Sequence, residues 1–209
     1  MTKLGRKMRL HWILVAYFER IWEGVPEEAT PERFRLRCDF LLANVQPGER
    51  VLDLGCGDGA FVAALAAHRA RPVGADVAGE ALRRARLHHP QLEFVQSADA
   101  LPFADGEFAV VWAGELLEHV QDGLGLLEEV ARVLRPEGRL LVSTPDHGWW
   151  RRLSVALSRR RFEAHFDPRA DHVRFFTASS LETLLLSARF VDLDVRSRRG
   201  VLLAAATRH

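Results

Sequence analysis

Three glycines at every second position follow an acidic residue near the end of an apolar run. Residues 51–61 read VLDLGCGDGAF, so Gly55, Gly57 and Gly59 come soon after Asp53. Because glycine has no Cβ, the chain can turn sharply there and pass close to a ligand. A helix that begins after such a turn also presents free backbone N–H groups. This spacing predicts a binding loop for a small, nucleotide-like molecule.

The charges around this loop narrow the choice of ligand. The loop satisfies the dinucleotide fingerprint G-x-G-x-x-A, and Asp76 lies where a ribose-binding acid is expected. Asp53 and Asp58, however, would face a pyrophosphate, and like charges in a partly buried cleft cost on the order of several kcal/mol. A ligand with an ammonium and a sulfonium but no phosphate would be attracted instead. S-adenosylmethionine has these groups.

Strands and helices alternate from this loop onward. Hydrophobic patterning and turn residues predict strands over residues 50–54, 71–76, 92–96, 108–113 and 139–144. They predict helices between these strands, over residues 60–68, 79–88 and 122–134. This alternation is typical of a doubly wound α/β fold, in which a parallel sheet is covered on both faces.

The C-terminal part of the chain breaks this rhythm. A capped helix over residues 177–188 is followed by strands over residues 191–196 and 201–207. The turn between these two strands is too short for a parallel crossover. The two strands are therefore expected to form an antiparallel hairpin at the end of an otherwise parallel sheet.

Two helices are expected before the glycine loop. The second has Thr30 as its cap and Pro31 in its first turn, and it ends at the turn QPG, residues 46–48. The first contains an apolar run within residues 10–22 that Glu19 and following charges interrupt. A membrane span needs about 20 apolar residues, so we expect a buried or interfacial helix here.

Five segments resemble the motifs of one known family. They read VLDLGCG at 51–57, GADV at 74–77, SADALPF at 97–103, LLEHV at 116–120 and LRPEGRL at 134–140. In this order, with the terminal hairpin, they are similar to class I S-adenosylmethionine-dependent methyltransferases of the broad bacterial group that includes small-molecule and quinone-pathway enzymes. The resemblance covers residues 30–209. It implies a seven-stranded, mostly parallel sheet of order 3-2-1-4-5-7-6 with an antiparallel C-terminal hairpin.

The resemblance also implies how the cofactor would be held. Asp76 would accept hydrogen bonds from both ribose hydroxyls, Asp99 would face the adenine amine, and Asp53 would meet the methionine end. Two alternatives stay open, because Asp76 can instead cap the helix that follows and Asp99 can stabilise its own turn. The implied cofactor site consists of Asp53, Gly55, Cys56, Gly57, Asp76, Val77, Asp99, Ala100, Leu101, Ala113 and His119.

Histidines are the candidates for proton transfer. Methyl transfer is an in-line displacement, so a base is needed only when the acceptor must lose a proton early. His119 lies next to the expected cofactor pocket, where its ring either acts as the base or shapes the pocket. His165 and His172 lie in a segment that resembles a lid over the substrate, or else caps helices in a surface loop. His147 is a further candidate. No spacing of ligands indicates a metal site.

A basic, aromatic stretch over residues 149–161 has three interpretations. It begins WWRR and ends RRR, with apolar residues roughly along one helical face. It would contact an anionic membrane surface, hold an anionic substrate through arginines, or form a solvated lid helix. A nucleic-acid substrate is not expected, because the chain carries no base-flipping motif and no RNA-binding module.

The composition indicates one globular domain. The 209 residues are 48% apolar and 27% charged, with a net charge of +1, so neither disorder nor general affinity for nucleic acid is expected. Two cysteines give no disulfide framework, which favours a cytoplasmic location. We expect an N-terminal helical cap over residues 1–46, a methyltransferase domain over 47–209 and a lid inserted at 146–176.

The expected function is therefore transfer of a methyl group from S-adenosylmethionine to oxygen, nitrogen or carbon of a small, lipophilic molecule. One alternative is an NAD-dependent oxidoreductase, which Asp53 and the terminal hairpin oppose. Another is a non-catalytic module that binds the cofactor or a partner protein, because methyl transfer needs few dedicated residues.

Overall fold

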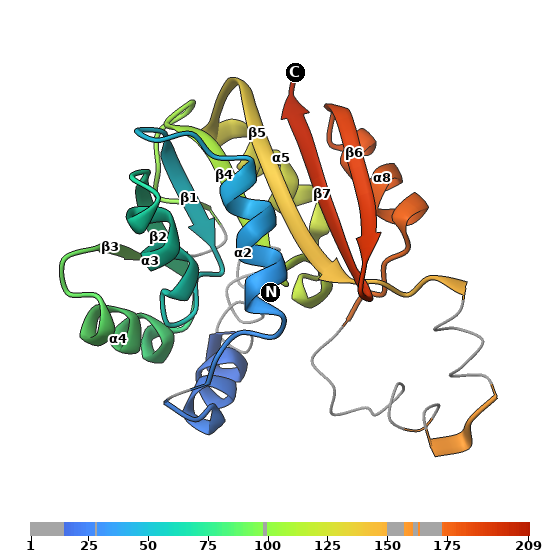
Figure 1. Ribbon diagram of the computed structural model, residues 1–209, viewed down its shortest axis with the longest axis horizontal. Helices are drawn as coiled ribbons and strands as arrows, with labels where there is room; N and C mark the ends of the chain where they lie inside the picture. The colour runs from blue at the N-terminus through green and yellow to red at the C-terminus, as the bar shows by residue number, and fades with distance from the viewer. Residues whose placement is uncertain (1–14, 28, 98–99, 150–156, 161–162, 164–172) are drawn as a thin grey trace, which may run out of the picture.

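A single sheet organises the chain. The computed structural model describes residues 15–27, 29–97, 100–149, 157–160, 163 and 173–209. Within these residues, seven strands form one sheet of order β3-β2-β1-β4-β5-β7-β6 (Figure 1). The strands are β1 Arg50–Leu54, β2 Arg71–Asp76, β3 Glu93–Gln96, β4 Phe108–Gly114, β5 Leu134–Pro145, β6 Phe190–Arg198 and β7 Val201–Arg208.

The strand directions and order confirm the expected fold class. Strands β1 to β5 pair in parallel, whereas β7 is antiparallel to both β5 and β6. The hairpin between β6 and β7 turns through Arg199 and Gly200, whose φ angles are 51° and 78°. Positive φ at both central residues is what a two-residue hairpin turn with the correct twist requires. The turn is therefore tighter than expected, and both strands are longer.

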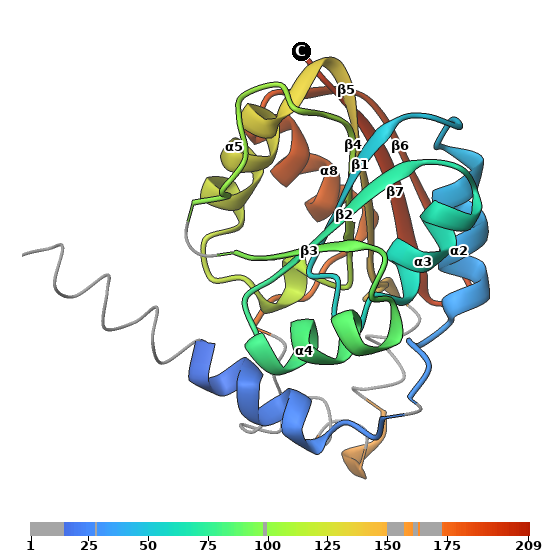
Figure 2. The same cartoon turned by 90° about the vertical axis from the view of Figure 1, so that its left-hand side faces the viewer.

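Helices cover both faces of the sheet. Helices α2 (Phe34–Ala43) and α3 (Ala60–Ala67) lie on one face, and α5 (Gly123–Val133) and α8 (Ala178–Ser187) on the other (Figure 2). Helix α4 (Gly79–His88) packs on β2 and β3. A further helix over residues 15–24 lies at the end of the molecule where β1 and β5 terminate (Figures 1 and 2). No helix in the described part of the chain is long and apolar enough to cross a membrane.

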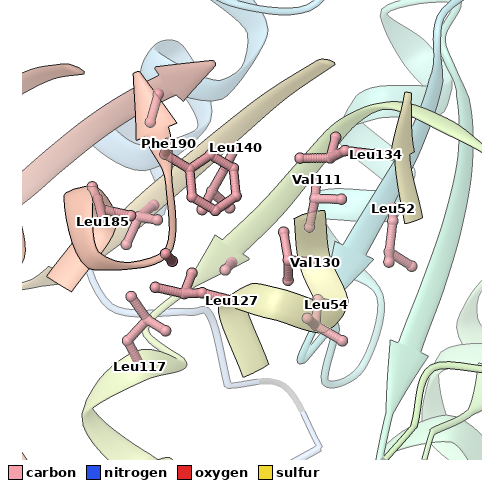
Figure 3. Packing of buried hydrophobic residues seen from close by; sticks show 14 of the residues in the cluster. Leu52, Leu54, Val111, Leu117, Leu127, Val130, Leu134, Leu140, Leu185 and Phe190 are labelled. Carbon is pink, nitrogen blue, oxygen red and sulfur yellow. The ribbon is translucent and has the colours of Figure 1, made fainter. Parts of the chain in front are cut away.

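The central strands are buried on both sides. Figure 3 shows Leu127 and Val130 of α5 and Leu185 of α8 packed around Val111 and Leu140 of the sheet. Val51, Trp112 and Leu141 belong to a second cluster, on the face that α2 and α3 cover. Since strand residues alternate between faces, Asp53 lies on the same face as Val51, toward α2.

Two predicted element starts differ from the observed ones by three residues or more. Helix α2 begins at Phe34, after Arg33 in a left-handed conformation, because Pro31 opens a turn in which Phe34 N–H donates to the Pro31 carbonyl. Strand β5 begins at Leu134 and runs through the turn expected before residue 139. Leu134 pairs with Phe108, and a register shift in the β4–β5 ladder absorbs the extra residues. By contrast, the helix starts expected at residues 122 and 177 are confirmed, because Asp122 and Thr177 cap α5 and α8.

Candidate functional site

The glycine loop lies at the carboxyl end of β1, where ligands bind in doubly wound sheets. Gly55 and Gly57 have φ angles of 77° and 55°, which side-chain-bearing residues rarely adopt. The Asp76 carboxylate at the end of β2 holds the loop, because its Oδ2 accepts from Gly57 N–H and its Oδ1 from Ala78 N–H, both at 2.9 Å. The loop is therefore preorganised by an acid from the neighbouring strand.

Asp53 is a buried acid, and one oxygen of its carboxyl group has no hydrogen-bond partner among the described residues. Its side chain is 1% exposed, and the unpartnered atom is Oδ2. Burial raises the pKa of Asp53 to about 8, while the nearby Arg37 guanidinium acts in the opposite direction. An unpartnered carboxylate oxygen is costly inside a protein. A cationic group that reaches this position would remove that cost.

Arg37 of α2 is a buried cation beside these acids. It is 4% exposed, its Nε donates to Ser143 Oγ at 2.9 Å, and its guanidinium lies 4.8 Å from the Phe61 ring centroid. The Ser143 hydroxyl donates in turn to Glu115 Oε1 at 2.9 Å. Burial lowers the pKa of Arg37, and the carboxylates of Glu115 and Asp53 oppose that shift. Arg37 therefore links α2 to the carboxyl ends of β1, β4 and β5.

Glu118 extends the polar cluster on the α5 side of the sheet. It lies in the short 3-10 helix Leu117–His119, is 1% exposed, and accepts from Thr144 Oγ1 at 3.1 Å through Oε2. Its Oε1 has no partner among the described residues. Burial and the neighbouring Glu115 raise the pKa of Glu118 to about 8. Its backbone carbonyl accepts from Val173 and Arg174, so the residue also joins β4 to the segment before α8.

The raised pKa values predict that stability falls as the pH rises above 5. Between about pH 4 and pH 8 the folded protein keeps protons on Asp53 and Glu118 that the unfolded chain releases. The free energy of unfolding should then fall by up to about 1.4 kcal/mol per pH unit for each carboxyl. Urea denaturation at pH 5.0, 6.5 and 8.0 measures this slope.

Matched variants separate Glu118 from the other acids. Glu118→Gln removes one titrating group, so its stability should fall less steeply with pH than that of the wild type. Glu182, which is exposed on α8, provides the control substitution Glu182→Gln. Equal slopes for wild type, Glu118→Gln and Glu182→Gln would contradict the assignment.

Comparison with known proteins gives the family. A family model described as a methyltransferase domain matches residues 27–195, which is most of the chain. The chain belongs to the class I S-adenosylmethionine-dependent methyltransferases.

Named relatives of this methyltransferase cover it only in part. The ubiquinone biosynthesis O-methyltransferase of Xanthomonas campestris pv. campestris is 40% identical over 116 residues, which are 52% of this chain and 48% of that protein. The protein of the same name from Albidiferax ferrireducens is 32% identical over 170 residues, 77% of this chain and 66% of that protein. The methyltransferase chain thus spans about half to two thirds of these relatives' lengths.

Solved structures share the fold at low sequence identity. A methyltransferase from a complex with the Haloferax volcanii Trm112 activator has a TM-score of 0.71 and 21% identity, covering 91% of this chain and 97% of that one. The S-adenosylmethionine-dependent methyltransferase of Methanosarcina mazei has a TM-score of 0.64 and 22% identity, covering 80% and 96%. The [4+2]-cyclase SpnF, with a TM-score of 0.67 and 18% identity over 88% and 85%, also shares the fold. The fold alone therefore does not establish methyl transfer.

S-adenosyl-L-methionine is the cofactor of this methyltransferase family, and the described residues fit it. Asp53 offers an unpartnered buried oxygen to a cation, and the glycines beside it adopt positive φ angles that carry no side chain toward a ligand. Asp76 already accepts two backbone N–H groups, but each carboxylate oxygen has a second lone pair for a ribose hydroxyl. Asp76 does not cap the first turn of α4, since the carboxylate there belongs to Glu19.

The other predicted site residues differ in how far they are buried, and some lie outside the described residues. Val77 is half-buried, Leu101 and Ala113 are buried, and Ala100 is exposed. Cys56 is buried against β2, and burial raises the pKa of its thiol well above the ordinary range, which opposes a redox role. Asp99, His165 and His172 lie outside the described residues, as does much of the stretch 149–161.

The two described histidine candidates differ in surroundings. His119 is half-buried, and its ring lies edge-on to Phe18 with 6.1 Å between centroids. His147 is 5% exposed, with Nδ1 3.1 Å from the Pro145 carbonyl oxygen and its ring against Phe175. His147 is thus held beside β5 in the described structure.

Sequence reasoning missed three charged residues of this region. Arg37 lies three residues after Phe34 and four before Leu41, so its position on the buried face of α2 was a detectable signal. Glu118 is part of the LLEHV segment, of which only the histidine was considered. Glu19 was read only as the end of an apolar run, and nothing in its neighbours predicts contact with α4.

Proposed function

We propose that the chain transfers a methyl group from S-adenosylmethionine to an oxygen of a small, apolar, hydroxylated molecule. The observation that carries the proposal is the unpartnered Asp53 carboxylate beside a glycine loop braced by Asp76. Such a loop offers acceptors for an ammonium and a ribose. A bound ammonium would favour the ionised form of Asp53, whereas a pyrophosphate would disfavour it. Oxygen is preferred to nitrogen or carbon because the relatives are named O-methyltransferases.

The proposed role of each residue follows from where it lies in the site. When bound, S-adenosylmethionine supplies a methyl group on a positively charged sulfur. Asp53 would hold the ammonium of the cofactor and Asp76 its ribose. Arg37, whose guanidinium lies against Gly114 at the end of β4, would pair with the methionine carboxylate. His119 stays a candidate for accepting the proton of the acceptor hydroxyl, as do His165 and His172. Positioning in a dry site is the main requirement for this displacement.

Apolar side chains support an apolar acceptor. Trp149, Val173 and Phe175, which flank the ends of the segment after β5, are 55%, 53% and 42% exposed. We include the expected division into a cap over residues 1–46, a domain over 47–209 and a lid at 146–176 in the proposal, together with a cytoplasmic location. Peripheral membrane contact through residues 149–161 stays a prediction.

A two-part experiment tests the function. The purified chain is first titrated with S-adenosylhomocysteine or NAD, and at about 100 times the Kd the former should raise the melting temperature by about 5–10 °C. The chain is then given S-adenosylmethionine and a pair of catechols, one with an alkyl chain and one without. Mass spectrometry should detect O-methylation, with the higher kcat/KM for the alkylated catechol.

The outcomes distinguish the alternatives. Tight NAD binding without a response to S-adenosylhomocysteine would favour the oxidoreductase. Cofactor binding without turnover of either catechol, or of amine and carbon acceptors, would favour a non-catalytic module. Turnover of an amine but of neither catechol would retain the methyltransferase and reject oxygen as the target.

A further inference from the structure

The helix over residues 15–24 lies across the carboxyl end of the sheet, beside α4 (Figure 2). Three of its side chains, Phe18, Glu19 and Trp22, are half-buried and lie on one helical face because of their spacing. Each contacts a different loop of the proposed cofactor site. The loops follow β1, β2 and β4, so the helix spans the space between them.

Trp22 packs directly onto the glycine loop. A Cβ placed on Gly57 would lie 2.7 Å from the indole ring, well inside van der Waals contact. The Arg84 guanidinium of α4 lies 5.9 Å from the centroid of the Trp22 ring and donates to the Val25 carbonyl at 2.7 Å. Gly57 therefore has two neighbours with different roles. The Asp76 carboxylate accepts its N–H, and the Trp22 ring packs against it.

Glu19 fastens the helix to α4. Its Oε1 accepts from Gly79 N–H at 2.6 Å and its Oε2 from Glu80 N–H at 2.9 Å. Helix α4 has no capping side chain of its own, since Ala78 occupies the N-cap position. A carboxylate there is favoured by the free N–H groups and by the helix dipole. Glu19 is thus a cap supplied from a distant part of the chain, next to Asp76 and Val77.

Phe18 completes the span on the far side. Its ring meets His119, which follows β4, in an edge-on contact. The helix is thereby attached at both sides of the sheet's switch point, between β1 and β4. Among the described residues, its attachments include a capping carboxylate, an arginine and aromatic contacts to the glycine loop and to His119.

We propose that the helix over residues 15–24 is a strap that closes the cofactor site, with Glu19 as the positioning residue that fastens it and Trp22 as the side chain that covers the glycine loop. The inference rests on the proposed function, since it assigns a wall to that same site. A ligand seated between the three loops leaves only after the strap detaches from α4. The strap therefore sets the rate at which the product S-adenosylhomocysteine dissociates.

Stopped-flow measurement of S-adenosylhomocysteine dissociation tests the strap. Glu19→Gln removes the charge and one acceptor from the α4 cap, so the dissociation rate should rise by about five- to tenfold. Trp22→Ala should raise it as well. Glu23→Gln is the matched control, because Glu23 is exposed on the same helix, and its rate should equal that of the wild type.

Amide hydrogen exchange gives a second readout in the free protein. Loss of the Glu19 cap should speed exchange at Gly79 and Glu80 but leave the amides of α5 unchanged. Wild-type dissociation rates in both Glu19→Gln and Trp22→Ala would overturn the strap while leaving cofactor binding intact. If the wild type fails to bind S-adenosylhomocysteine, the proposed function is overturned, and the strap with it.

Discussion

Replacing Asp76 with alanine should weaken S-adenosylhomocysteine binding by about 100-fold or more. The variant would lack the carboxylate that accepts from two ribose hydroxyls, and each such hydrogen bond to a charged acceptor is worth about 1.5–3 kcal/mol. It would also release the N–H groups of Gly57 and Ala78, so the glycine loop would lose its brace. Isothermal titration of wild type and Asp76→Ala measures the change in Kd.

A conservative variant separates the two roles of Asp76. Asp76→Asn keeps an oxygen for one backbone N–H but cannot accept from both ribose hydroxyls, so binding should stay weak while the melting temperature recovers. Asp39→Ala, an exposed acid on α2, is the control and should bind as the wild type does. Unaltered affinity in Asp76→Ala would show that the ribose role was misassigned.

Replacing Arg37 with methionine should destabilise the protein by about 3–5 kcal/mol at pH 8, the usual cost of removing one partner from a buried set of charges. Asp53, Glu115 and Glu118 would then lose their shared cation. At pH 5 the loss should be smaller, because Asp53 and Glu118, whose pKa is raised to about 8, are then neutral in the folded protein. Urea denaturation at both pH values measures the difference.

Arg35 provides the matched control for this prediction. It lies on the exposed side of the same helix, and Arg35→Met should change stability by less than about 0.5 kcal/mol. An equal loss at pH 5 and pH 8 in Arg37→Met would indicate that packing against Phe61 and Trp112, rather than charge, stabilises Arg37.

The sequence predicts the elements best where the signals are local. Strands β1 and β2 and helix α4 have the predicted bounds, because a buried strand is an apolar run and glycine or aspartate marks its ends. The start of α2 was missed because Thr30 and Pro31 are equally good turn residues, and a left-handed Arg33 is not encoded in any pattern. Local signals therefore give existence and type more reliably than boundaries.

The sequence indicated the positions of the acids in the candidate site, but it did not indicate their partners from distant parts of the same chain. Asp53 and Asp76 follow strands at recognisable positions, whereas Glu19 caps a helix that begins about sixty residues later in the chain. Arginine is rarely fully buried. The spacing of Phe34, Arg37 and Leu41 places Arg37 on the buried face of α2, but it does not identify the acids that surround it. Such contacts depend on the tertiary fold, and a single sequence carries no signal for them.

The two ends of the segment that follows β5 are joined to each other. Asp146 and Phe176 form an isolated β-bridge, and His147 N–H donates to the Phe176 carbonyl at 2.8 Å. A loop whose ends are tied can change in length at small cost, because each doubling of its length adds only about 0.6 kcal/mol of closure entropy. Insertions or deletions between these anchor points would leave the sheet and glycine loop undisturbed. Under the proposed function, the methyl acceptor could therefore change through this one segment while the residues proposed to hold the methyl donor stay in place.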